Sequence, residues 1–79
     1  MTRSIDTPAA TALGRYLLVS RVSAGLTQQD AAERLGVRRQ SVIGWERGQQ
    51  VPPLTILPRL VDVYGVGPAD LTRAMREGA

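Results

Sequence analysis

The sequence contains no cysteine, no histidine and no lysine among its 79 residues. Without cysteine no disulfide can staple the chain, and without cysteine and histidine the usual structural zinc sites are excluded. A catalytic site would have to rely on Asp, Glu, Ser or Tyr alone. We therefore expect a protein that is not an enzyme, binds no metal and uses no cofactor.

Aromatic residues are scarce, because phenylalanine is absent and only one tryptophan and two tyrosines occur. The core must then consist of Leu, Val, Ile and Ala, which suits closely packed short helices. A chain of this length forms one small domain that buries only about 60% of its unfolded surface. No stretch alternates with the period of a strand for long enough to matter. The sequence predicts an all-α domain.

Long apolar runs are also missing, since the longest covers only residues 16–19. Such a run is too short for a membrane span or a signal-peptide core, so we expect a cytoplasmic, nucleoid-associated protein. The net charge is +3, and all ten cationic residues are arginine. Base composition can explain that excess, but arginine also binds phosphate and guanine edges bidentately. The second explanation is favoured for Arg38, Arg39 and Arg47, which lie close together.

Residues 26–48 carry the signals of two short helices joined by a tight turn. Thr27 can cap the first helix, and Asp30 can complete a capping box. Gly36 follows the apolar face of that helix, where glycine readily adopts the left-handed conformation that ends a helix. The second helix begins two residues later and closes at Gly48. This arrangement is a helix-turn-helix, whose second helix can enter the DNA major groove.

The segment resembles the DNA-binding domain of the Cro and phage-repressor (Xre-like) transcription regulators. Within the motif the matching residues are Leu26, Thr27, Gln28, Ala32, Leu35, Gly36, Val37, Val42, Trp45, Glu46 and Gly48. Outside it they are Leu13, Gly14, Leu17, Arg21, Pro52, Leu54, Leu57, Leu60, Gly65, Val66 and Leu71. The resemblance implies a five-helix, lambda-repressor-like domain over residues 8–75, with the motif at 27–48. We expect a flexible arm over residues 1–7 and fraying over residues 76–79.

The remaining helices are placed by proline and glycine. Pro8 suits a first helical position, and the first helix should run to about Ala24. Prolines mark a loop after the motif. The fourth helix should begin between residues 54 and 58 and end at Tyr64, and a last short helix should open after Gly67.

The start of the second motif helix faces base edges in proteins of this kind. The expected base-reading residues are Arg38, Arg39, Gln40, Ile43 and Gly44. Arginine suits guanine, glutamine suits adenine, and an aliphatic side chain can touch a thymine methyl group. The alternative is the solvated face of any surface helix. The family usually has a capping Ser or Thr at position 38, and its loss costs roughly 1 kcal/mol. That cost is easier to understand if Arg38 contacts DNA, so we favour base reading.

Gly44 has two interpretations, because glycine within a helix costs about 1 kcal/mol relative to alanine. Either the helix lies too near the DNA for a side chain, or the position is unselected. Contacts to phosphate are expected from Thr27, Gln28, Ser41, Arg47, Gln49 and Gln50. The resemblance supports Gln28 and Ser41 most, and backbone N–H groups at the start of the first motif helix attract anions.

The resemblance also implies that Arg21 and Glu46 form a structural ion pair. This pair would tie the first helix to the end of the second motif helix. The alternative is two unrelated surface charges.

One side of the first helix carries an unexpected apolar set. Leu13, Leu17 and Ala24 should face the core, whereas Leu18, Val19 and Val22 point the other way. An exposed apolar patch usually marks an interface, and Leu71 and Met75 of the last helix could extend it. The alternative is that the N-terminal arm covers the patch.

We predict a sequence-specific, double-stranded DNA-binding transcriptional regulator, a repressor that binds a palindromic operator as a homodimer. Residues 38–47 would lie in the major groove. The alternative is a protein-interaction module, such as the antitoxin of a toxin–antitoxin pair, for which Leu18, Val19 and Val22 would bind the protein partner.

Overall fold

The computed structural model describes residues 8–76, except for the side chains of residues 8–11 and 75. The arm expected over residues 1–7 and the fraying expected over residues 77–79 lie outside the described part. Arg76, also expected to fray, is the last residue of a helix.

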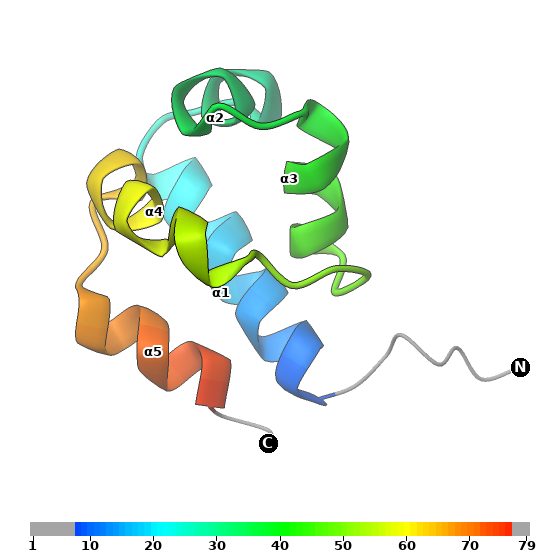
Figure 1. Cartoon of the computed structure of the whole chain (residues 1–79), viewed down its shortest axis with the longest axis vertical. Coiled ribbons are helices and arrows are strands. Elements are labelled where there is room, and N and C mark those ends of the chain that lie inside the picture. Colours follow the sequence, from blue (N-terminus) through cyan, green and yellow to red (C-terminus); the bar gives the residue numbers. More distant parts are fainter. Residues whose placement is uncertain (1–7, 77–79) are drawn as a thin grey trace, which may run out of the picture.

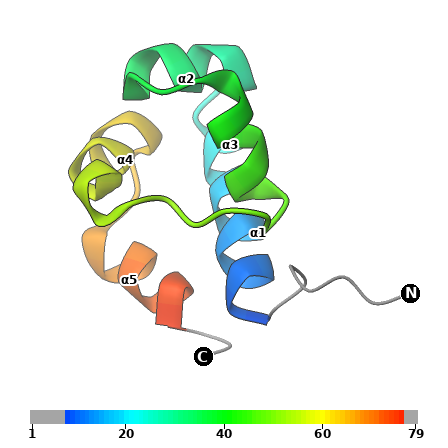
Figure 2. The same cartoon turned by 45° about the vertical axis from the view of Figure 1, so that its right-hand side comes forward.

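The described residues form five α-helices and no strand, which confirms the predicted all-α fold. The helices are α1 (Pro8–Ser23), α2 (Gln28–Leu35), α3 (Arg39–Glu46), α4 (Leu57–Tyr64) and α5 (Pro68–Arg76), with a single 3-10 turn, η1 (Leu54–Ile56), before α4. The long α1 packs against α3 and α5, and α2 packs against α3 and α4. Figures 1 and 2 show α2 and α5 at opposite ends of the molecule. No helix in the described range is long and apolar enough to cross a membrane.

Local signals fix both ends of α2. The Asp30 backbone N–H donates to the Thr27 hydroxyl over 3.0 Å, and the Thr27 N–H donates to the Asp30 carboxylate over 3.1 Å, so the expected capping box is present. Gly36 ends the helix in the left-handed region at φ 73°. A contact that the sequence did not reveal also satisfies this end, because the Arg59 side chain on α4 donates to the Leu35 carbonyl over 3.1 Å.

The core is aliphatic, as expected, with one tryptophan and one tyrosine. Its buried apolar residues are Leu13, Leu17, Leu26, Ala31, Ala32, Leu35, Val42, Trp45, Ile56, Leu60, Tyr64, Leu71 and Ala74. The expectation that Ala24 faces the core was wrong, because α1 ends at Ser23 and Ala24 lies exposed in the turn that follows. Ser20 and Arg21 are the buried residues in the last turn of α1, residues 20–23.

Gly14 sets how closely α1 approaches α3. A Cβ atom on Gly14 would lie 2.6 Å from the carbonyl oxygen of Glu46 and 2.7 Å from that of Trp45. Both distances are shorter than a carbon and an oxygen can tolerate, and both neighbours are backbone atoms. Only glycine therefore allows α1 to cross the end of α3 in this arrangement, which positions the second motif helix.

Candidate nucleic-acid interface

The helices α2 and α3 form the expected helix-turn-helix. Residues 36–38 join them, and Arg38 precedes α3 in an extended conformation without any side-chain capping bond. Its guanidinium is exposed and is not used to start the helix. This is the lost cap that the sequence indicated, and it leaves the Arg38 side chain available at the surface of the motif.

The two sides of α3 differ sharply. Val42 and Trp45 are 0% and 4% exposed and hold the helix against the core. On the other side Arg39 and Gln40 are exposed, while Ile43 is half-buried. A helix fixed from behind and polar in front has the shape needed to enter a major groove.

Base reading at position 44 would require Gly44 to lie open on this surface. The structure shows instead that Gly44 is covered. It is buried, and a Cβ atom on it would lie 3.1 Å from Cδ of the Gln50 side chain. The N–H groups of Gln49 and Gln50 both donate to the Gly44 carbonyl, over 2.9 and 3.2 Å, so the loop folds back over the helix. The glycine therefore makes room for Gln50, an explanation that sequence reasoning missed.

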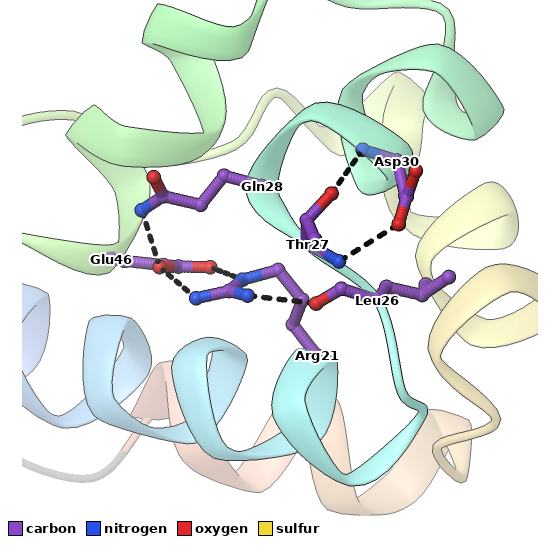
Figure 3. Close-up of polar contacts among 6 residues, drawn as sticks. All are labelled: Arg21, Leu26, Thr27, Gln28, Asp30 and Glu46. Atoms are coloured by element: carbon purple, nitrogen blue, oxygen red, sulfur yellow. Dashed lines mark hydrogen bonds and ion pairs between the residues drawn. The ribbon is translucent and has the colours of Figure 1, made fainter.

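Arg21 and Glu46 are brought together, as Figure 3 shows. Nε of Arg21 donates to Oε2 of Glu46 over 2.6 Å, and Nη2 donates to Oε1 over 3.1 Å. The side chains are only 10% and 5% exposed. A two-pronged contact of this kind between charged groups is strong and directional. The hydrogen bond with Glu46 raises the pKa of Arg21 above its ordinary value, so the Arg21 guanidinium stays charged although it is buried.

Two further contacts extend this pair into a network joining three helices. Nη1 of Arg21 donates to the Leu26 carbonyl over 2.8 Å, which fixes the turn before α2. Nε2 of Gln28, in the first turn of α2, donates to Oε1 of Glu46 over 3.1 Å. The position of α3 relative to α1 and α2 is thereby set by polar contacts as well as by the core. No sequence signal pointed to the Leu26 carbonyl.

These contacts alter the interpretation of the phosphate-binding candidates at the start of α2. The Gln28 amide is committed partly to Glu46, and Thr27 is committed to the capping box. The Asp30 carboxylate is exposed at the same helix end, and the hydrogen bond from the Thr27 backbone lowers its pKa. Its negative charge opposes a phosphate there. The first N–H groups of α2, at Gln28 and Gln29, have no acceptor within the helix and remain the donors of this end.

The other candidates lie on the flank of the motif. Ser41 is half-buried, and Arg47, Gln49 and Gln50 are exposed. The Arg47 side chain therefore places a positive charge at the end of α3, beside the loop that carries the two glutamines.

The apolar set on α1 is exposed as expected, with Leu18 at 39%, Val19 at 57% and Val22 at 61%. Leu71 cannot extend it, because it is 2% exposed and belongs to the core. That expectation was wrong, since the apolar side of α5 packs against α1 instead of facing outward. The side chain of Met75 lies outside the described residues.

A model of the helix-turn-helix domain family matches residues 12–75. An uncharacterized HTH-type transcriptional regulator from Methanothermobacter thermautotrophicus is 42% identical over 45 residues, covering 57% of this chain and 65% of that protein. A putative HTH-type transcriptional regulatory protein from Pyrobaculum aerophilum is 34% identical over 76 residues. That match covers 96% of this chain and 26% of the relative, so the chain spans about a quarter of its length.

Two solved structures have the same fold. The restriction-modification controller protein C.AhdI from Aeromonas hydrophila superposes with a TM-score of 0.72 and 31% identity, covering 78% of this chain and 94% of its own. The clp gene regulator ClgR from C. glutamicum gives a TM-score of 0.75 over 89% of this chain and 90% of its own. Its identity of 24% supports the fold alone. The family match, the five helices and the motif geometry agree, and the chain belongs to the helix-turn-helix domain family, with the resemblance to Xre-like regulators confirmed.

Proposed function

We propose that this protein is a transcriptional regulator that binds double-stranded DNA sequence-specifically and represses transcription. The observation that carries the proposal is the exposed side of α3, where Arg38, Arg39 and Gln40 stand free of the core. The relatives are named transcriptional regulators and C.AhdI is named a controller protein, and we extend that role to this chain. Repression follows most simply, because a domain bound in the major groove blocks the DNA beneath it.

Rigidity supports base reading by α3. Val42 and Trp45 anchor the helix in the core, and Glu46 ties its end to α1 and α2. Side chains that read bases must be held in one orientation, since a correct bidentate contact gives roughly 1–3 kcal/mol of discrimination against a wrong base. The fixed frame of α3 supplies that orientation.

The proposed complex contains two copies of the chain on a palindromic operator, each placing residues 38–47 in a major groove. Phosphate contacts would come from the α2 N-terminus with Thr27 and Gln28, and from Ser41, Arg47 and Gln49 along the flank. These contacts fix the register on the duplex without specifying its sequence. With about 6–10 neutralised phosphates in the complex, log K should fall with log salt at a slope of roughly −5 to −9.

Selection of bound sequences from a random DNA pool tests the proposal. The chain should enrich a palindromic site, and Arg39→Ala should relax preference at one base pair per half-site, at a cost of about 1–3 kcal/mol. Arg73→Ala on α5 is the matched control, because it removes the same charge outside the motif. It should leave base preference unchanged. The proposal is wrong when no sequence is enriched, or when Arg39→Ala weakens selected and random DNA equally.

A second candidate function is a protein-interaction module, such as the antitoxin of a toxin–antitoxin pair. The observation that favours it is the exposed set Leu18, Val19 and Val22, which DNA reading does not require. An empty selection, together with a co-purifying protein lost on Leu18→Glu, would establish this function in place of the first.

A further inference from the structure

We propose that Gln50, outside α3, is a base-reading residue that reaches the DNA surface through the space left by Gly44. The inference rests on the proposed function, because it requires α3 to lie in the major groove. It assigns sequence specificity to a loop residue and changes the role of Gln50 from phosphate contact to base contact.

The position of the Gln50 amide is the first step. Its Cδ and Oε1 atoms lie 3.1 and 3.4 Å from the point where a Cβ atom of residue 44 would stand. The amide group, not only the stem of the side chain, therefore occupies the place of a residue-44 side chain. Gln50 as a whole residue is nevertheless exposed, so the side chain that covers Gly44 lies at the surface of the molecule.

The second step is the location of this point on α3. Residues four apart share one face of a helix, so position 44 follows Gln40 on the side that the proposed function turns to the DNA. The two positions are separated by about 6 Å along the helix axis, close to two base-pair steps of about 3.4 Å. The Gln50 amide should then meet a base pair one or two steps from the pair that Gln40 contacts.

The third step is what holds the loop there. Both loop N–H groups, of Gln49 and Gln50, donate to the carbonyl of Gly44. This fixes the backbone from which the Gln50 side chain extends, and limited freedom is what a base-reading group requires. A glutamine amide carries an NH2 group that donates beside an oxygen that accepts, the pattern that pairs with N7 and N6 of adenine.

Gln49 provides a matched comparison, because it is also an exposed glutamine and its N–H also donates to the Gly44 carbonyl. The three atoms nearest to the Cβ position of residue 44 all belong to Gln50, and none belongs to Gln49. On a site selected with the unmodified chain, Gln50→Ala should lower discrimination at a single base pair by roughly 5- to 150-fold, the range of one bidentate contact. Gln49→Ala should instead lower the affinity for every DNA sequence equally and leave the base preference unchanged. Gln50→Glu should move preference at that base pair from adenine toward cytosine, since a carboxylate accepts from the cytosine amino group.

Gly44→Ala tests the route by which Gln50 arrives. The new methyl group would displace the Gln50 amide, so discrimination should fall at the same base pair, and Gly44→Ala with Gln50→Ala should lose no more than Gln50→Ala alone. Circular dichroism of each variant verifies folding. The inference is overturned when Gln50→Ala behaves like Gln49→Ala while Arg39→Ala and Gln40→Ala still relax single base pairs, a result that leaves the proposed function intact. Failure of the unmodified chain to enrich any sequence overturns both proposals.

Discussion

At the scale of the residue, Glu46 is an acid in a domain that we expect to face DNA. An unpaired carboxylate there would repel phosphate and would be expensive to bury. Arg21 and Gln28 surround it with three donors, from α1 and α2, so its charge is neutralised and used to hold three helices together.

Removing one member of the Arg21–Glu46 pair should therefore be severe. Glu46→Gln leaves the buried Arg21 charge without its carboxylate, and Arg21→Met leaves the Glu46 carboxylate without its cation. Each variant should lower the free energy of unfolding by about 3–5 kcal/mol. Arg21→Met with Glu46→Leu removes both charges but leaves the Leu26 carbonyl without its donor. That double variant should still cost about 1–3 kcal/mol.

Urea unfolding measures these differences, and the exposed Gln29–Glu33 contact on α2 serves as the control. Glu33→Gln should change the free energy of unfolding by no more than about 0.5 kcal/mol. If Glu46→Gln changes the free energy of unfolding by as little as Glu33→Gln does, the Arg21–Glu46 pair does not stabilise the fold.

The buried Tyr64 should make the free energy of unfolding depend on pH in the alkaline range. Burial raises its pKa to about 12, and the nearby Glu46 charge adds to the rise. An unfolded tyrosine ionises near pH 10, so the phenolate form favours the unfolded chain. The stabilisation is complete below about pH 10 and is lost as pH rises from about 10 to about 12. Urea unfolding across this window should show a steep loss that Tyr64→Phe largely removes, and parallel curves for the two proteins would contradict the assignment.

At the scale of the element, α2 and the turn after it were predictable because their signals are local. Thr27, Asp30 and Gly36 act on residues within one helical turn, and the structure contains both the capping box and the left-handed cap. The boundaries of α3 and α4 followed from similar punctuation. These features depend on neighbours in the sequence, so the sequence alone reveals them.

The misplaced residues depend on contacts that no local signal encodes. The sequence shows that α5 has an apolar side, but not whether Leu71 on that side meets α1 or solvent. Gly44 looked like an exposed position because sequence reasoning did not anticipate that the Gln50 side chain, six residues further on, covers it. The Arg21–Glu46 contact was expected only through family resemblance, since 25 residues separate its members.

The two glycines inside helices should respond in opposite ways to the same substitution. In Gly14→Ala the methyl group meets backbone oxygens of α3 that cannot rotate away, and overpacking of this kind costs about 1–3 kcal/mol or more. In Gly44→Ala it meets only the side chain of Gln50, which can move. The gain in helix propensity, about 1 kcal/mol, should then dominate. Thermal unfolding should give a lower midpoint for Gly14→Ala and a higher one for Gly44→Ala. A midpoint that does not fall for Gly14→Ala would refute this account of the contact between α1 and α3, and one that does not rise for Gly44→Ala would show that the Gln50 side chain cannot move aside.

At the scale of the whole molecule, we expect the groups that read DNA bases and the groups that join two copies of the chain to lie on different elements. The proposed base-reading groups lie on α3 and the loop after it, whereas the exposed apolar residues lie on α1. A small domain rarely leaves such a patch uncovered without a use. Because Leu71 belongs to the core, the part of the patch that the structure describes consists of Leu18, Val19 and Val22.

We expect this α1 patch to join two copies of the chain on the operator. Val19→Glu with Val22→Glu should leave the fold intact, because these residues are 57% and 61% exposed and surface substitutions usually change stability by no more than about 0.5 kcal/mol. The variant should sediment as a monomer and bind a palindrome without cooperativity, while binding a single half-site like the parent chain. Ala69→Glu with Thr72→Glu, at exposed positions on α5, is the control, because each double variant lowers the formal net charge by two, from +3 to +1. If both variants remain dimers and weaken DNA binding equally through their charge, the patch has no role. If only the α5 variant loses the dimer, the interface lies on α5.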